Sequence, residues 1–170
     1  MKALVYHGPG KRAWEERPSI IDRDDNRLNV AKKFGATKTV NSKDGTAAEK
    51  VMELTNRKGV DAAIEAVGIP ATFEICENIL APGGRLANIG VHGKPVEFHI
   101  EKLWAHNITL TTRLVDTVTP PLLLKEVIAG KLKPWQLITH EFKLGDVMKA
   151  YDTFGNAAKE KALKVLLKAA

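Results

Sequence analysis

Short apolar runs alternate with longer amphipathic stretches along this chain, and glycine or proline separates most of them. The apolar and alternating runs predict strands, because successive side chains of a strand point to opposite faces of a sheet. These predicted strands lie at Lys2–His7, Ile20–Asp22, Lys38–Val40, Val60–Val67, Arg85–Ile89, Ile108–Val115, Leu137–Phe142 and Leu163–Leu167.

Apolar residues spaced three and four apart predict helices between these strands. The helices run from Asp24 or Asp25 to about Phe34, from about Thr46, from Pro70, from Pro120 to Ala129, and from about Leu144 to Phe154. Strands and helices therefore alternate, which predicts an α/β fold with a mostly parallel sheet covered by helices on both faces.

The run Ile20–Asp22 is typical of the second strand of a dinucleotide-binding unit, where an acid ends the strand. In such units a G-x-G-x-x-G turn lies about 20 residues before the acid. Here only Gly8 and Gly10 lie upstream, 14 and 12 residues before Asp22, and the second half of the fingerprint is absent. We therefore expect a Rossmann-like, doubly wound sheet whose phosphate loop is incomplete.

Asp22 is the strongest candidate binding residue in this pattern. A carboxylate at the end of a second strand can accept both ribose hydroxyls of an adenosine and repels a 2′-phosphate, which favours NAD over NADP. The alternative is that Asp22 only charges and caps the following helix, together with Asp24 and Asp25. Gly68 and Gly90 follow predicted strands, and each either lets a cofactor approach the backbone or is simply a turn glycine.

Composition narrows the classes of function. The 170 residues carry a net charge of +6, but the lysines are interleaved with acids and no arginine-rich run or aromatic platform accompanies them, so we expect no nucleic-acid binding. No apolar run approaches the length of a membrane span, and we expect no membrane partner. The opening residues are too short an apolar stretch for a signal peptide, and the chain has a single cysteine. We therefore expect a cytoplasmic protein.

The residues that usually carry bond-making chemistry form no recognisable set. Cys76 lies on an apolar helical stripe, which favours a buried small hydrophobe over a nucleophile or metal ligand. The five histidines lack both the H-E-x-x-H motif and the close spacing that puts two ligands on one helical face. We expect no catalytic residue and no metal site.

From Ile21 onward the chain resembles the zinc-dependent medium-chain alcohol dehydrogenases. The matching stretches, in the family's order, are IDRDDNRLNVAKKFGATKTVN, GVDAAIEAVG, LAPGGRLANIGVHGKPVEFHIEKLW, ITLTTRLVD and AYDTFGNAAKEKALKVLLKA. The first residues, MKALVYHGPGKRAWEERP, resemble the opening hairpin of that family.

The resemblance also implies what is missing. In the family, most of a GroES-like catalytic domain and the first strand, glycine-rich turn and first helix of the nucleotide-binding domain lie between the hairpin and the second strand. The zinc ligands, the proton-relay hydroxyl and the pyrophosphate cradle belong to that interval. The resemblance therefore implies an internally truncated dehydrogenase that is inactive alone, binds NAD weakly and has no ligands for the family's zinc. The alternatives are a non-catalytic dinucleotide-binding or dimerisation module, or a functionless deletion product.

The resemblance carries over one wall of the cofactor site. Asp22 matches the ribose acid, with Arg23 beside the adenine. The other wall residues that it implies are Val67 and Gly68, Ile89, Gly90 and Val91, and Thr112 and Arg113. In the family the last strand, here Ile108–Val115, also pairs across a twofold axis, so we expect a homodimer through this edge.

The resemblance divides the chain into a hairpin remnant at 1–19, an incomplete NAD(P)-binding domain at 20–136 and a remnant of the catalytic domain at 137–170. Deleting the first strand leaves a place in a sheet ordered 3-2-1-4-5-6. We hypothesise that Lys2–His7 fills it, with Lys11–Arg17 as a short crossover. The alternatives are a hairpin packed with Leu163–Leu167, or a strand exchange between two chains.

Overall fold

The computed structural model describes residues 2–6, 12–16, 18–114 and 118–169. The chain divides into two compact units, Met1–Arg23 with Ala31–Val115 and Asp24–Val30 with Asp116–Ala170. The helix α1 (Asp25–Lys33) contributes residues to both units. The boundary at residues 136 and 137 that the sequence suggests stays a prediction.

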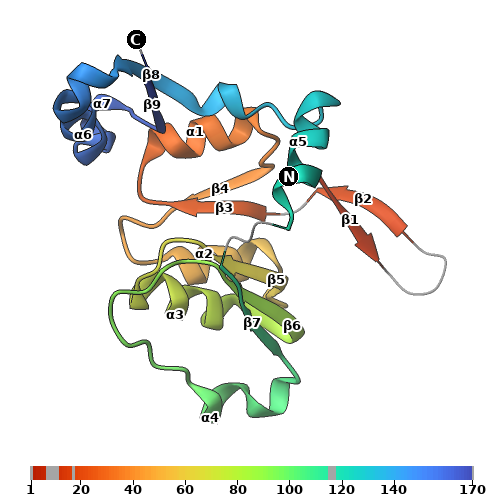
Figure 1. The fold of residues 1–170 in the computed structure, drawn as a ribbon. Helices are drawn as coiled ribbons and strands as arrows, with labels where there is room; N and C mark the ends of the chain where they lie inside the picture. Colours follow the sequence, from red (N-terminus) through yellow and green to blue (C-terminus); the bar gives the residue numbers. More distant parts are fainter. Residues whose placement is uncertain (1, 7–11, 17, 115–117, 170) are drawn as a thin grey trace. The chain divides into compact units, whose positions relative to one another are not determined.

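The described strands of the first unit form three sheets (Figure 1). One is an antiparallel pair, β1 (Lys2–Tyr6) with β2 (Arg12–Glu16). The second is a parallel pair, β3 (Pro18–Asp22) with β4 (Lys38–Asn41). The third is parallel and three-stranded, in the order β5 (Val60–Glu65), β6 (Leu80–Asn88) and β7 (Thr109–Thr112). This mixture of helices with parallel strands confirms the predicted α/β class.

The hypothesis that the first strand fills the vacated place is wrong for the described residues. β1 pairs with β2, with Lys2 opposite Glu16 and Tyr6 opposite Arg12, and neither β3 nor β5 is its partner. The segment expected to be a crossover is instead strand β2, while His7, Lys11 and Arg17 lie outside the described residues. A short connection favours an antiparallel neighbour, because a parallel one needs a crossover of about a dozen residues or more.

The hairpin alternative is therefore correct in part. The C-terminal strand β9 (Lys164–Lys168) pairs with β8 (Ile138–Lys143) in a parallel ladder rather than with β1. Exchange of strands between two chains stays a hypothesis.

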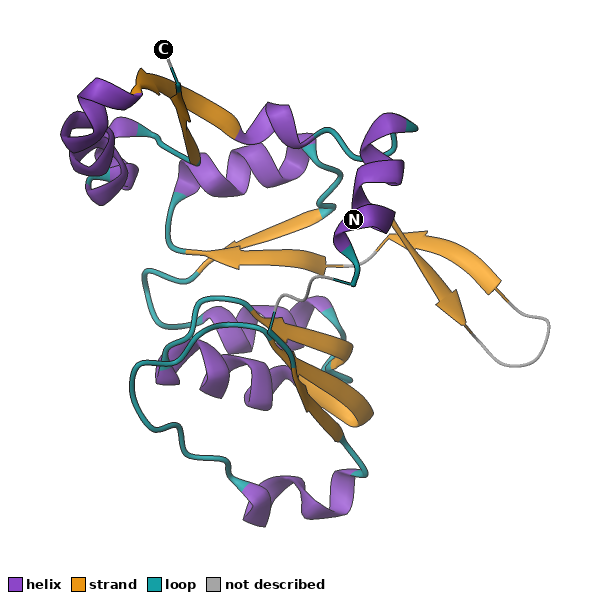
Figure 2. Cartoon of the chain, in the orientation of Figure 1, coloured by secondary structure: helices purple, strands orange, loops and turns teal. Residues whose placement is uncertain are grey.

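Two helices pack against the parallel strands of the first unit (Figure 2). They are α2 (Ala47–Leu54) and α3 (Pro70–Ile79), and α3 begins at the proline that the sequence predicts. The shared core comprises Val40, Ala47, Val51, Ala63, Phe73, Cys76, Ile79, Leu80 and Leu86, with Ile21 packed against it. Residues of β4 and β6 thus belong to one core although no described backbone ladder joins β3 to β5.

The opposite face of β5 is exposed to solvent. Ala63 and Glu65 are buried, whereas Ile64 between them is 64% exposed. A strand places alternate side chains on opposite faces, so α2 and α3 cover one face and leave Ile64 on the other. In a doubly wound sheet that second face is covered by the helix that follows the first strand, and the sequence lacks this segment.

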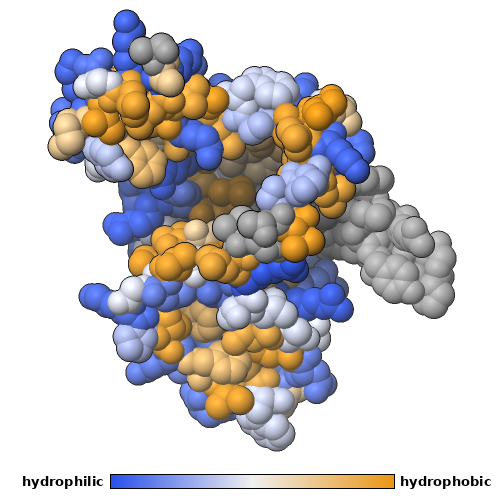
Figure 3. Space-filling view, in the orientation of Figure 1, coloured by the Kyte–Doolittle hydropathy of each residue, from blue (hydrophilic) through white to orange (hydrophobic). Residues whose placement is uncertain are grey.

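The second unit contains the β8–β9 pair and most of the remaining helices. Their bounds are α5 (Pro120–Ile128), η2 (Pro134–Leu137), η3 (Leu144–Asp146), α6 (Val147–Gly155) and α7 (Ala157–Glu160). Apolar side chains of α5 stay exposed, and Figure 3 shows an apolar patch over this helix. The first unit is completed by α4 (Ile100–Leu103) and η1 (Trp104–His106), which precede β7.

Candidate functional site

The candidate site lies where β5, β6 and β7 end. The Glu65 carbonyl oxygen accepts hydrogen bonds from the N–H groups of Ile89 and Gly90, at 2.8 and 3.1 Å. The Arg113 N–H donates to the Asn88 carbonyl oxygen at 3.2 Å. The carboxyl ends of three parallel strands therefore meet at one edge, which is where ligands bind in open α/β sheets.

A buried carboxylate organises this edge. Glu65 is 1% exposed, and its Oε1 accepts hydrogen bonds from the N–H groups of Val67 and Gly68, both at 2.9 Å. The Thr72 hydroxyl donates to the same oxygen at 2.7 Å. One side chain at the end of β5 thus fixes both the following loop and the first turn of α3.

His92 faces the other oxygen of this carboxylate. Its Nε2 lies 2.8 Å from Asn88 Oδ1 and 3.3 Å from Glu65 Oε2. Asn88 donates its amide N–H to the Gly90 carbonyl oxygen, which sets the orientation of the amide. Because Nε2 faces two acceptors, it carries the proton. His92 Nδ1 is buried and has no hydrogen-bond partner among the described residues.

Two opposed effects set the pKa of Glu65. Desolvation by burial raises it, while hydrogen bonds from Thr72, Gly68 and Val67 and the nearby His92 lower it. The net result is a pKa below the usual value of 4.5. The carboxylate is therefore ionised at neutral pH, and its role here is to hold the loops rather than to transfer protons.

The two predicted glycines are required by contact between the two loops. A Cβ on Gly68 would overlap the backbone of Val91, and Gly68 also has a φ of +87°. A Cβ on Gly90 would overlap the Glu65 carboxylate and the backbone of Gly68. The space beside each glycine is thus filled by protein, so the loop packing alone accounts for both residues.

The apolar members of the predicted wall project into solvent. Val67, Ile89 and Val91 are 63%, 51% and 77% exposed. Thr112 and Arg113 are exposed as well, at the end of β7. The structure therefore brings together seven of the nine predicted residues along the ends of β5, β6 and β7.

The remaining two predicted residues end a different sheet. Asp22 is half-buried at the end of β3, where its carbonyl oxygen accepts the Ser42 N–H at 3.0 Å, and Arg23 is exposed. Asp24 caps α1, since Asp24 Oδ1 accepts the N–H groups of Asn26 and Arg27. The capping alternative therefore holds for Asp24.

The described residues contain no group of three His, Cys, Asp or Glu side chains that could hold a metal ion. Cys76 is buried, as its place on the apolar stripe predicts, and burial raises the pKa of its thiol to about 11. Every helix of the described part is too short or too polar to cross a membrane.

Sequence reasoning missed Glu65, Thr72, Asn88 and His92. One signal for Glu65 was available, because it is an acid at the position of a strand where the alternation places buried side chains. His92 and Asn88 follow no spacing rule, since their contact depends on how the loop after β6 folds back toward β5.

Comparisons with known proteins identify a family of dehydrogenases. The family model described as zinc-binding dehydrogenase matches residues 12–127. An alcohol dehydrogenase of Cupriavidus necator is 34% identical over 87% of this chain and 41% of its own length. A D-xylulose reductase of Morganella morganii is 32% identical over 78% of the chain and 40% of its own length.

Solved structures give the same result. The zinc dependent alcohol dehydrogenase 2 from Streptococcus pneumonia in apo form matches with a TM-score of 0.82 and 52% identity, covering 86% of this chain and 43% of that one. The alcohol dehydrogenase TADH from Thermus sp. ATN1 matches with a TM-score of 0.79 and 29% identity, covering 88% and 43%. The chain spans about two fifths of the length of these relatives.

We expect Gly90→Ala to destabilise the protein by about 1–3 kcal/mol, because the added methyl overlaps a carboxylate and backbone atoms. Gly93→Ala is the matched control, since nothing lies within 4 Å of a Cβ there. Its effect should stay within about 0.5 kcal/mol. Urea unfolding measures both. Equal stabilities of the two variants would show that the loops are not in close contact.

The lowered pKa of Glu65 also predicts how stability depends on pH. Its ionised form stabilises the fold above the unfolded-state value of 4.5, and this contribution is lost as pH falls through the lower folded-state pKa. We expect the free energy of unfolding to fall as the pH drops below about 4.5, and to fall less steeply in Glu65→Gln. Glu74→Gln, an exposed acid on α3, is the control and should follow the wild type. Identical pH profiles for wild type and Glu65→Gln would contradict this.

Proposed function

We propose that this chain, which belongs to the zinc-binding dehydrogenase family, is the cofactor-side portion of a medium-chain alcohol dehydrogenase. It keeps one wall of an NAD site and does not oxidise alcohols alone. The observation that carries the proposal is the extent of the family match, residues 12–127, in a chain of about two fifths the length of its relatives. What matches is the part of the family that holds a dinucleotide.

Asp22 is the residue we assign to the ribose of the adenosine. It ends β3 half-buried, at the carboxyl end of a strand that pairs in parallel with β4. A carboxylate here accepts ribose hydroxyls and disfavours a 2′-phosphate, so the expected cofactor is NAD. Arg23 would lie beside the adenine.

The exposed apolar residues after β5 and β6 suit the flat faces of a dinucleotide. Val67 would contact the adenine side, and Ile89 and Val91 the nicotinamide side, with Thr112 and Arg113 at the end of β7. The Glu65 carboxylate holds these loops together before any cofactor arrives, because its partners are all backbone groups and side chains of the chain itself. When bound, NAD would supply hydride acceptance.

Binding should be weak. The sequence has no G-x-G-x-x-G turn, so the helix N-terminus that normally holds the pyrophosphate is missing. Zinc does not fit the residues present, since the described part of the chain has no ligand trio for it. The single cysteine, a buried thiol, is consistent with the reducing cytoplasm that we propose as its location.

A second candidate function is a dimerisation module. β7 is an edge strand of its sheet, and all four of its residues are exposed. The Arg113 N–H points toward β6, and N–H groups of successive strand residues point to opposite sides. The N–H of Leu110 therefore points away from β6 and is available to a second copy of the strand.

The cofactor proposal predicts that millimolar NADH raises the melting temperature by about 1 °C, as expected when the ligand concentration is near the dissociation constant. Asp22→Asn should weaken binding by about tenfold, because it removes a charged hydrogen-bond acceptor. Glu74→Gln should bind like the wild type. Thermal shifts with NADH, NADPH and added zinc make these measurements.

Three results would overturn parts of this proposal. The absence of any shift with NADH would exclude the NAD site, and an equal shift with NADPH would exclude the role of Asp22. If the purified chain reduced NAD with an alcohol in the presence of zinc, measured by the absorbance of the NADH formed, the proposal that it is inactive alone would be wrong.

The dimer proposal predicts that Leu110→Pro converts a dimer to a monomer, because proline removes the N–H that faces the partner strand. Leu110→Ala keeps this N–H and should remain dimeric. Sedimentation equilibrium at micromolar to submillimolar concentration distinguishes these species. A monomeric wild type, or a dimeric Leu110→Pro, would contradict pairing through β7.

A further inference from the structure

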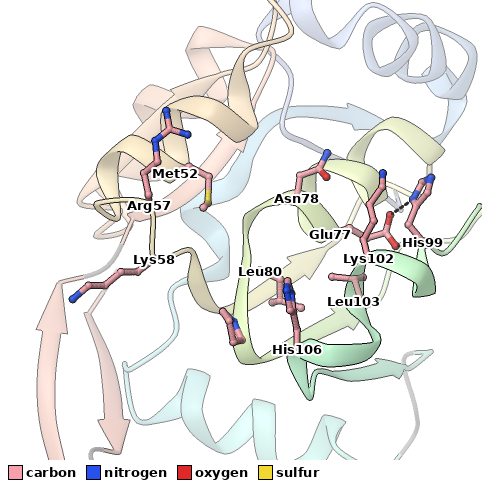
Figure 4. Close-up of a pocket in the computed structure, with 11 residues that line it drawn as sticks. Met52, Arg57, Lys58, Glu77, Asn78, Leu80, His99, Lys102, Leu103 and His106 are labelled. Carbon is pink, nitrogen blue, oxygen red and sulfur yellow. Dashed lines mark hydrogen bonds and ion pairs between the residues drawn. The ribbon is translucent and has the colours of Figure 1, made fainter.

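A cavity of about 300 Å³ lies at the amino end of the β5–β7 sheet, away from the candidate cofactor loops (Figure 4). Its walls include the turn at Arg57 and Lys58 before β5, Leu80 at the start of β6, and the α4–η1 segment before β7. Parallel strands begin at the same edge of a sheet, so this cavity and the loops after β5 and β6 lie at opposite edges. Its volume matches the smallest ligand pockets of proteins.

The charged lining of this cavity is mainly cationic. Arg57, Lys58 and Lys102 line it, and Glu77 is the one carboxylate in the lining. Met52, Leu80, Pro82 and Leu103 supply an apolar part of the wall. The cavity therefore offers positive charge beside an apolar surface, which suits a small organic anion.

Glu77 does not face the cavity without partners, because both of its oxygens accept hydrogen bonds. Its side chain is 3% exposed, and both oxygens accept hydrogen bonds from His99, Oε1 from the backbone N–H at 3.0 Å and Oε2 from Nδ1 at 2.9 Å. This contact raises the pKa of His99, which favours the protonated ring. His99 Nε2 also lies 3.8 Å from the exposed Glu97 carboxylate. Both oxygens of the Glu77 carboxylate are thus occupied by donors of His99.

The three cations differ in how they are held. Arg57 forms an ion pair with Glu49 on the outside of α2, and Figure 4 shows Arg57 and Lys58 extending away from the centre of the cavity. Lys102 lies beside the Glu77–His99 pair in the same view. We therefore expect Lys102 to contact a bound anion inside, and Lys58 to act at the opening.

The turn that carries two of these cations has an uncommon backbone. Asn56 and Arg57 have φ angles of 52° and 59°, in the left-handed region that non-glycine residues rarely adopt. The Arg57 N–H donates to the Met52 carbonyl oxygen at 2.7 Å, which fixes the turn against the end of α2. Left-handed residues are common where helices end, so the end of α2 accounts for this turn and places Arg57 and Lys58 at the cavity.

We propose that this cavity binds a small organic anion, with a carboxylate or phosphate group near Lys102 and Lys58 and an apolar body against Leu80 and Leu103. Neither the family match nor the proposed cofactor site assigns this function. The proposal is also independent of NAD binding, because no residue is shared between the two sites.

The test is a titration of the full chain, followed by amide ¹H–¹⁵N spectra. The probes are phenyl phosphate, benzoate, benzamide as the neutral analogue of benzoate, and inorganic phosphate. We expect the two aromatic anions to bind and to shift the amides of Lys58, Asn78 and Lys102. Benzamide should not bind, and inorganic phosphate should bind more weakly than phenyl phosphate. The stronger of the two aromatic anions identifies the preferred head group.

Charge-removing variants complete the test. Lys102→Gln and Lys58→Gln should each weaken binding by roughly threefold, and the double variant by roughly tenfold. Lys125→Gln on α5 is the control for a change of net charge and should bind like the wild type. The spectra themselves confirm that each variant is folded.

Four results would overturn the proposal. They are benzamide binding as tightly as benzoate, inorganic phosphate binding as tightly as phenyl phosphate, wild-type affinity in Lys58→Gln/Lys102→Gln, or shifts confined to residues 67, 68 and 89–92. The last result would place the anion at the cofactor loops instead.

Discussion

The first unit depends on the side chains of α2 and α3, because backbone hydrogen bonds do not join its parallel strands into one sheet. β3 with β4 and β5 with β6 and β7 are separate ladders among the described residues. Ala47 and Val51 of α2 lie in the same core as Val40 of β4 and Leu86 of β6. Burial of apolar area is non-directional, so this core can hold two sheets together without the strand that joins them in a complete dinucleotide-binding domain.

Without the first strand, the free-energy penalty for unpaired backbone N–H and C=O groups is lower than the sequence suggests. An unpaired N–H or C=O is expensive only when it is buried away from water. β3 and β5 are both edge strands here, and the far face of β5 is exposed at Ile64. Water can reach such an edge, so no strand has to be recruited to fill the place. The N-terminal residues then form the structure that their own sequence favours, an antiparallel hairpin.

Most single elements could be predicted from the sequence, whereas their pairing could not. The start of α3 at Pro70 and the strand at Lys38 follow from local signals, and the α/β class follows from their alternation. β1 could pair with a strand near it in the sequence or with a distant one, and the hydrophobic periodicity does not indicate which. The strand predicted at Arg85–Ile89 illustrates the same limit, because β6 already begins at Leu80 and its register with β5 shifts before Arg85. At the candidate site, the family resemblance predicted the exposed wall residues. The hydrogen bonds of Glu65 could not be predicted, because they depend on how the loops after β5 and β6 fold.

The two ends of the β5–β7 sheet show how one fold can supply different chemistry at each edge. At the carboxyl end the Glu65 carboxylate accepts backbone N–H groups, and two glycines let the loops touch, while Val67, Ile89 and Val91 are exposed. At the amino end both oxygens of the Glu77 carboxylate accept hydrogen bonds from His99, and Lys58 and Lys102 line the cavity beside it. At both ends a buried glutamate organises the local structure. A buried carboxylate is stable only when its oxygens accept hydrogen bonds or face a cation, so folding requires the partners of Glu65 and Glu77 to be in place. The positions of these partners fix the nearby loops, and the loops determine which residues are exposed to a ligand at each end of the sheet.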